Sequence, residues 1–219
     1  MSKMFKTVTH TWNPFTGCLF DCSYCWARKM ALGRCNYPDF KPTFHPERLK
    51  QISRFKEGDF VFVSSMGDIA WAGEQEITSI VSAIENSKAL FLIQTKNPEI
   101  FLHYREFFSM TNVVHGVTIE SNRCWNGSKA PCPVFRYSAI KTDTHPHKFL
   151  SIEPIMDFDL DIFTEWVMDI NPEIIEIGAD NYHNNLTEPS PEKLAEFIKQ
   201  LEDAGLNVKQ KDGLGRLLK

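Results

Sequence analysis

Short apolar runs alternate with amphipathic stretches along almost the whole chain. The runs contain four to seven residues and are rich in β-branched or aromatic side chains, which is typical of buried strands. They are Thr7–Trp12, Phe60–Val63, Ala89–Gln94, Val113–Ile119, Phe149–Ile152 and Glu173–Ile177. Because strand and helix patterns alternate about six times, we expect parallel βαβ units. The predicted fold class is α/β, with either a partial barrel or an open doubly wound sheet.

The helix patterns between these runs have recognisable starts and ends. Apolar stripes at helical spacing cover Glu74–Ser87 and, over a shorter length, Asp161–Ile170. Asn97–Pro98 and Ser190–Pro191 each combine a capping residue with a proline suited to the first helical turn. Gly205 is a suitable stop for the last helix. We expect these stripes to pack on the sheet and to carry no chemistry.

Length and charge narrow the class of protein further. The 219 residues predict one domain, residues 1–219, with a core large enough to need no disulfide or structural metal. The net charge of −4 shows no basic surplus, so it neither supports nor excludes nucleic-acid binding. The first residues, MSKMFKTVTHTWNP, lack the apolar run of a signal peptide, and no window reaches the ~18 apolar residues of a membrane span. We therefore expect a cytoplasmic protein, in which six cysteines favour metal binding or thiol chemistry over disulfides.

Three cysteines, Cys18, Cys22 and Cys25, lie within eight residues of one another directly after the first apolar run. This spacing suits three irons of a 4Fe–4S cluster, whose fourth iron would then be open to a small molecule. A structural zinc site would need a fourth ligand, for which His10 is a candidate upstream. Inert buried thiols are the remaining alternative, but the flanking Gly17 and polar residues make a poor core pattern.

With the aromatic Tyr24 just before the third cysteine, this motif resembles the signature of radical S-adenosylmethionine (radical SAM) enzymes. The run HTWNPFTGC at residues 10–18 is similar to a poorly characterised, phage-associated branch of that superfamily. Segments 61–68, 95–98, 116–120 and 150–154 fit the same branch in the same order. The resemblance extends from about residue 8 to about residue 205. It implies a partial (β/α)6 barrel of parallel strands, a variant of the TIM-barrel architecture.

Polar side chains follow the apolar runs at the points where the strands should end. They are Ser64, Ser65 and Asp68, then Thr95 and Lys96, then Glu120, then Glu153, and finally Gly178 with Asp180. Ligands of parallel α/β folds bind at the carboxyl ends of the strands. Each residue alone is equally well explained as a helix cap or a solvated loop residue. Together they predict a site for a polar ligand of some size.

The resemblance assigns roles to several of these residues. Segment Ser64–Asp68 takes the place of the superfamily's Gly-Gly-Glu segment, which accepts the amino group of S-adenosylmethionine, although serines and an aspartate replace the glycines and the glutamate. Asp68 can still accept a hydrogen bond from an ammonium group. Glu120 corresponds to the residue that holds ribose hydroxyls, and Glu153 would lie near the adenosyl group or the substrate. Tyr24 resembles the aromatic residue near adenine.

The function implied is therefore radical SAM catalysis. The resemblance implies a 4Fe–4S cluster that takes an electron from a donor such as flavodoxin or ferredoxin. The cluster cleaves S-adenosylmethionine to a 5′-deoxyadenosyl radical, which abstracts hydrogen from a substrate. A chain that barely completes six βα units leaves the barrel open at the side, which favours a large substrate, either nucleic acid or protein. The alternative is a non-catalytic iron–sulfur or zinc-binding interaction module, which would have no need of Asp68, Glu120 and Glu153 at successive strand ends.

Three further cysteines and one long segment have no assigned role. Cys35 follows the motif, and Cys124 and Cys132 lie eight residues apart. The pair could bind an auxiliary cluster or zinc, or one thiol could donate a hydrogen atom, but ordinary unpaired thiols are the default in a cytosolic chain. Segment Asn122–His147 is too long for an ordinary connection. We expect a lid over the barrel mouth that contributes to substrate choice, with a helix of degenerate pattern as the alternative.

Overall fold

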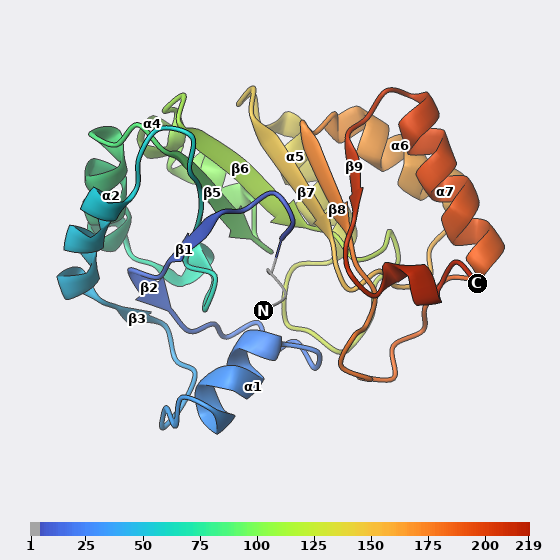
Figure 1. Cartoon of the computed structure of the whole chain (residues 1–219), viewed down its shortest axis with the longest axis horizontal. Coiled ribbons are helices and arrows are strands. Elements are labelled where there is room, and N and C mark those ends of the chain that lie inside the picture. The colour runs from blue at the N-terminus through green and yellow to red at the C-terminus, as the bar shows by residue number, and fades with distance from the viewer. Residues whose placement is uncertain (1–4) are drawn as a thin grey trace.

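The computed structural model describes residues 5–219, and its main feature is a curled sheet of seven parallel strands (Figure 1). The strands follow one another across the sheet in chain order: β1 (His10–Trp12), β4 (Phe60–Val63), β5 (Leu90–Thr95), β6 (Val113–Thr118), β7 (Lys148–Ile152), β8 (Ile174–Ile177) and β9 (Val208–Gln210). A separate antiparallel pair, β2 (Phe15–Thr16) and β3 (Thr43–Phe44), lies after β1. The predicted α/β fold with a partial barrel of parallel strands is confirmed, with one strand more than six.

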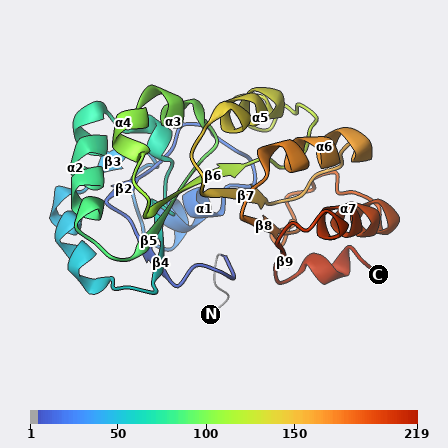
Figure 2. The ribbon, with the colours of Figure 1, turned by 90° about the horizontal axis from the view of Figure 1, so that it is seen from above.

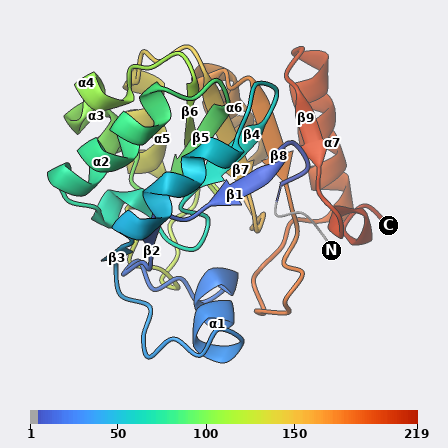
Figure 3. The same cartoon turned by 60° about the vertical axis from the view of Figure 1, so that its left-hand side comes forward.

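Helices cover the convex face of this sheet, where they form an outer arc (Figure 2). They are α2 (Glu74–Glu85), α3 (Glu99–His103), α4 (Arg105–Phe108), α5 (Pro133–Thr142), α6 (Leu160–Ile170) and α7 (Pro191–Asp203). Helix α1 (Trp26–Gly33) instead projects away from the sheet, near the loop that follows β8 (Figure 3). Short 3₁₀ turns span Pro46–Arg54, Ile69–Trp71 and Leu214–Arg216. None of the helices within residues 5–219 is long and apolar enough to cross a bilayer.

The predicted helix boundaries agree with the structure where an apolar stripe and a cap coincide. The Ser190 side chain accepts a hydrogen bond from the backbone N–H of Lys193 and so caps α7. Pro98, expected at the first helical position, instead occupies the cap position of α3, so this helix begins one residue later than predicted. Segment Asn122–His147 consists of two parts. Its second half contains α5, in agreement with the alternative prediction of a helix with a degenerate pattern. Its first half, residues 122–132, remains irregular.

The concave face of the sheet is apolar near the amino ends of the strands and polar near their carboxyl ends. The apolar part is a cluster formed by Phe62, Leu92, Val114 and Phe149, which packs against Phe5 from the N-terminal segment. Farther along the same strands, side chains of this face are Gln94, Thr118 and Ser151, all of which line a cavity. Successive residues of a strand point to opposite faces, so the apolar side chains between them pack under the helices. One end of the half-barrel is thus filled, and the other is open and polar.

The N-terminal segment closes the filled end through a buried carboxylate on β8. Glu176 accepts hydrogen bonds from the backbone N–H groups of Lys6 at 2.9 Å and of Thr7 at 3.0 Å. The hydroxyl of Thr7 donates a third, at 2.7 Å. A buried carboxylate needs such partners to offset its loss of hydration. These contacts fix the segment across the concave face.

Candidate functional site

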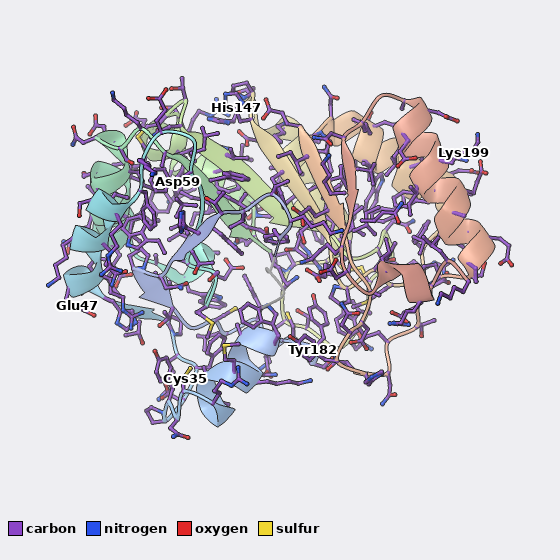
Figure 4. The ribbon with its side chains drawn as sticks, viewed as in Figure 1. Cys35, Glu47, Asp59, His147, Tyr182 and Lys199 are labelled. Carbon is purple, nitrogen blue, oxygen red and sulfur yellow. A yellow bond between two sulfur atoms is a disulfide. The ribbon has the colours of Figure 1, made fainter. Side chains whose placement is uncertain are left out.

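A hollow of about 160 Å³ opens at the carboxyl ends of the strands. It lies between the loop that carries the three clustered cysteines, the strand ends, and the loop after β8 that carries Tyr182 (Figure 4). Ten of the predicted site residues line it: Cys18, Cys22, Tyr24, Cys25, Ser65, Asp68, Thr95, Lys96, Glu153 and Asp180. Ser64 and Glu120 are buried and lie outside the lining. Gln94, Thr118 and Ser151, which were not among the predicted site residues, also line the hollow.

The three cysteines of the motif are free thiols on one loop at the edge of this hollow. Cys22 is buried in a small cluster with Phe20, Tyr24 and Met156, against which the other two cysteines pack. Burial raises the pKa of the thiols of Cys18 and Cys25, so metal binding there has to displace protons.

A 4Fe–4S cluster fits this donor set, because its thiolate ligands bind different irons. Within residues 5–219 no group of three His, Cys, Asp or Glu side chains is arranged around a single metal ion. The candidate fourth zinc ligand, His10, lies beside Asp59 instead, with 3.3 Å between Nε2 and Oδ1.

Two glycines tie the cysteine loop to the segment that follows β4. The backbone N–H of Gly17 donates to the carbonyl of Met66 at 2.9 Å, and that of Asp68 donates to the carbonyl of Gly17 at 3.2 Å. A Cβ at Gly67 would lie 2.7 Å from the carbonyl oxygen of Gly17, so no larger residue fits without a shift. Gly17 itself has φ +84° and faces the backbone of Lys41. These backbone contacts therefore fix the position of the cysteine loop relative to Asp68.

Asp68 is buried and makes three hydrogen bonds to neutral donors. Its carboxylate accepts from the Thr95 hydroxyl at 2.6 Å, from the backbone N–H of Lys96 at 2.9 Å and from that of Ala70 at 3.0 Å. Burial raises the pKa of Asp68, although these hydrogen bonds act in the opposite direction. A carboxylate offers about four acceptor positions, so one remains for a ligand in the hollow.

The two serines of the same segment shape the turn after β4. The Ser65 hydroxyl donates to the side-chain oxygen of Asn13 at 3.1 Å, and that oxygen also accepts from the backbone N–H of Met66. Ser64 has φ +58°, and its buried hydroxyl has no hydrogen-bond partner within the described chain. A non-glycine residue in this conformation marks a backbone held by its surroundings.

Glu120 is the centre of a buried ion network behind the hollow. Its carboxylate accepts from Lys96 Nζ at 2.5 Å and from Arg136 at 2.7 Å, and the Tyr24 hydroxyl also contacts it. Burial alone would raise the pKa of Glu120, but the two cations lower it to about 2. Both oxygens are thus occupied by the protein. No sequence pattern indicated the part played by Arg136, which lies on α5.

Glu153 faces the hollow and pairs with a residue that no motif pointed to. Its carboxylate contacts the ammonium group of Lys211, which directly follows β9. Burial raises the pKa of Glu153, while Lys211 lowers it. A Cβ at Gly178 would lie 2.7 Å from Glu153 Oε1, so this glycine leaves room for the carboxylate. Asp180 also lines the hollow and accepts hydrogen bonds from its own loop, including the backbone N–H of Asn184 at 2.5 Å.

A row of neutral polar groups crosses the floor of the hollow. Gln94 donates to the Thr118 hydroxyl at 2.7 Å, and Thr118 pairs in register with Ser151 on β7. The side-chain oxygen of Gln94 is buried and has no partner within the described residues. These groups carry no charge, so they suit an uncharged group that can donate and accept hydrogen bonds.

Cys124 and Cys132 form a disulfide in the structure, so the expectation of ordinary unpaired thiols is wrong for this pair. The segment between them lies against the cysteine loop, where Trp125 stacks on Tyr24 at 5.6 Å between ring centroids. Its contacts are therefore made with the predicted metal-binding loop. Cys35 is free and exposed beyond the end of α1 (Figure 4).

His145 and His147, at the other end of the long segment, lie apart from the hollow. His145 stacks on His115 at 4.0 Å between ring centroids. The ring of His115 in turn contacts Asp143, with 2.6 Å between Nδ1 and Oδ2. His115 stacks on Phe101 of α3 and contacts the carbonyl of Phe108 on α4, so these rings are part of the packing between β6 and those helices.

Comparisons with known proteins give a family and a fold. Residues 3–170 match a protein-family model described as "Protein of unknown function (DUF5131)". No curated protein sequence matches the chain.

Among solved structures, the chain is similar to the anaerobic sulfatase-maturating radical SAM enzyme anSMEcpe. Native anSMEcpe with bound AdoMet and the Cp18Cys peptide aligns with a TM-score of 0.54 at 12% identity, over 92% of this chain and 62% of that one. A histidine-tagged form with bound AdoMet aligns with a TM-score of 0.55 at 12% identity, over 92% and 60%. The chain thus spans about three fifths of the length of these enzymes, and the likeness shows that it has a radical SAM-like fold.

Proposed function

The chain belongs to the DUF5131 family, and we propose that it is a radical SAM enzyme acting on a macromolecular substrate. The observation that carries this proposal is the position of three free thiols from one loop. They line the same hollow as Asp68, at the carboxyl ends of a parallel half-barrel. This is the edge at which ligands of such folds bind.

In this proposal Cys18, Cys22 and Cys25 hold three irons of a 4Fe–4S cluster, and the fourth iron is open to S-adenosylmethionine. When S-adenosylmethionine is bound to the cluster, one electron from a donor such as flavodoxin or ferredoxin would release a 5′-deoxyadenosyl radical. The protein orients the reacting groups and excludes water from them. Tyr24 and the disulfide-closed segment around Trp125 cover the cysteine loop on its buried side.

The carboxylates of the hollow differ in what they can offer to S-adenosylmethionine. Asp68 hydrogen-bonds neutral donors and keeps an acceptor position, so it is our candidate for the methionine ammonium group. Glu153 faces the hollow beside Lys211 and can accept from hydroxyl groups of the adenosyl moiety or the substrate. Glu120 supports the site indirectly, through Lys96 and Tyr24. Ser64 and Ser65 maintain the turn on which Asp68 lies.

The substrate in this proposal is a nucleic acid or a protein whose reacting part enters the hollow. The row formed by Gln94, Thr118 and Ser151 favours an uncharged group at the floor, such as an amide or a nucleobase edge. The cations near it, Lys96 and Lys211, are paired with Glu120 and Glu153. A phosphate would therefore gain little there, and we place the charged backbone of any nucleic acid at the mouth.

Anaerobic reconstitution with iron and sulfide tests the proposal. We expect a brown protein with about four irons per chain, and Cys22→Ala should lose the cluster. With dithionite and S-adenosylmethionine, the reconstituted protein should release 5′-deoxyadenosine and methionine slowly even without substrate. A colourless protein with stoichiometric zinc would refute the proposal and favour a non-catalytic metal-binding module. An iron–sulfur protein that binds no S-adenosylmethionine would favour a non-catalytic iron–sulfur module.

A further inference from the structure

The segment Cys124–Cys132, which we call the clasp loop, is closed on itself by a disulfide and lies along the cysteine loop. Two backbone hydrogen bonds join the two loops. The N–H of Ser23 donates to the carbonyl of Gly127 at 2.9 Å, and the N–H of Lys129 donates to the carbonyl of Phe20 at 2.6 Å. These bonds flank Cys22 in the sequence on both sides.

Ser128 of the clasp loop places its hydroxyl oxygen 3.0 Å from the sulfur of Cys22. The same oxygen accepts a hydrogen bond from the backbone N–H of Ala130 at 3.0 Å, so its single proton is left to be donated. The competing acceptor, the carbonyl of Phe20, is more distant at 3.4 Å. A cysteine that ligates a metal is a thiolate and can only accept. The hydroxyl of Ser128 is therefore the donor when Cys22 is a ligand.

Two further features hold the clasp loop in this position. Trp125 stacks on Tyr24, which lies between Cys22 and Cys25 in the sequence. Gly127 lies directly under the indole, because a Cβ there would be 1.9 Å from the ring of Trp125. The disulfide then limits the conformations open to the nine-residue ring. Ser128 is thus fixed against Cys22 by contacts on both sides.

We infer that the clasp loop positions the cysteine loop and that Ser128 is a positioning residue that donates a hydrogen bond to the Cys22 thiolate. This inference rests on the proposed function for the part that concerns the cluster. Hydrogen bonds to ligand sulfurs are one of the means by which proteins set the potential of an iron–sulfur cluster. A hydrogen bond donated to the ligand sulfur stabilises negative charge on the cluster, and the cluster carries more negative charge after it is reduced. Ser128 therefore makes the cluster easier to reduce.

Redox titration of the reconstituted protein, followed by electron paramagnetic resonance, tests the role of the hydroxyl. Ser128→Ala should retain iron but show a more negative midpoint potential, and Ser128→Thr should restore the wild-type value. Asn126→Ala is the matched control, because Asn126 is exposed in the same loop. An unchanged midpoint potential in Ser128→Ala would overturn the assignment. So would a midpoint potential in Ser128→Thr or in Asn126→Ala that becomes as negative as that of Ser128→Ala.

Alkylation of the metal-free protein tests the positioning role without any cluster. Cys22 is 5% exposed and should react slowly with iodoacetamide, whereas exposed Cys35 serves as the internal reference in the same peptide map. In Cys124→Ser/Cys132→Ser the rate at Cys22 should rise about tenfold or more relative to Cys35, because the open loop has more conformations. An unchanged ratio would refute the positioning role. A raised ratio in a protein that never loads iron would support it and would refute the proposed function instead.

Discussion

Replacing Glu120 by Gln removes the negative charge at the centre of the buried network behind the hollow. The change leaves Lys96 and Arg136 facing an amide. The pKa of Glu120 falls from 4.5 to about 2 on folding, and at about 1.4 kcal/mol per pKa unit this corresponds to about 3 kcal/mol of stability at neutral pH. Breaking a buried ion pair typically costs about 3–5 kcal/mol. Arg136 keeps hydrogen bonds to the carbonyls of Thr118 and Pro131, so we expect the lower end of that range.

The same pKa determines how the loss should depend on pH. A carboxyl whose pKa is depressed on folding stabilises the protein above its unfolded pKa, and this contribution is lost as pH falls through the folded value. For Glu120 the window therefore extends from about pH 4.5 down to about 2. The difference in the free energy of unfolding between wild type and Glu120→Gln should be largest at pH 7. At pH 3 it should be less than about half as large.

Urea unfolding at pH 7, 5 and 3 measures this difference, with Glu165→Gln as the control. Glu165 is exposed on α6, so its replacement should change the stability by less than about 0.5 kcal/mol. The reasoning would be refuted if Glu120→Gln unfolded at the wild-type urea concentration. If Glu120→Gln kept the wild-type stability but lost affinity for S-adenosylmethionine, Glu120 would be a ligand group that binds the ribose, as the sequence resemblance implies.

Two further predictions concern Asp68 and the contact that positions it. Asp68→Ala should weaken S-adenosylmethionine binding by about 10- to 150-fold in anaerobic equilibrium dialysis, because one charge-assisted hydrogen bond is lost, while iron content is retained. Unchanged binding would place the ammonium group elsewhere. Gly67→Ala should lower the free energy of unfolding by about 1–3 kcal/mol and reduce iron loading, because its Cβ would meet the backbone of Gly17. Gly215→Ala, where a Cβ meets nothing within 4 Å, should change neither, and equal losses in both variants would contradict the close-approach argument.

The predicted strands β4 to β8 are found in the structure because burial on both faces leaves a continuous apolar run in the sequence. Strand β1 is shorter than its predicted run, and its His10 and Thr11 are exposed. Strand β9 and helix α1 are among the elements that lack such a signal. Strand β9 has three residues, of which Val208 is half-buried and the other two are exposed. Helix α1 buries only Ala27 and Ala31, so its sequence shows no apolar stripe. Both are held by what surrounds them, namely β8 and the cysteine loop, and local patterns do not contain that information.

The candidate site divides in the same way between local and distant contacts. The three cysteines occupy eight consecutive residues, so their proximity follows from the spacing alone. For the carboxylates at the strand ends, the sequence places them at one rim but does not say which are already paired. Glu120 meets Arg136 from a helix whose pattern was ambiguous, and Glu153 meets Lys211 from 58 residues away.

This pairing determines which carboxylate is best suited to a cationic ligand. Glu120 and Glu153 each contact a cation of the protein, whereas Asp68 hydrogen-bonds neutral donors. An ammonium group entering the hollow therefore gains most at Asp68, where it meets a charge that no ion pair among the described residues offsets. For this reason Asp68→Ala is expected to act mainly on ligand affinity and Glu120→Gln mainly on stability. The two variants, measured side by side for both properties, distinguish a ligand group from a supporting one at the same rim.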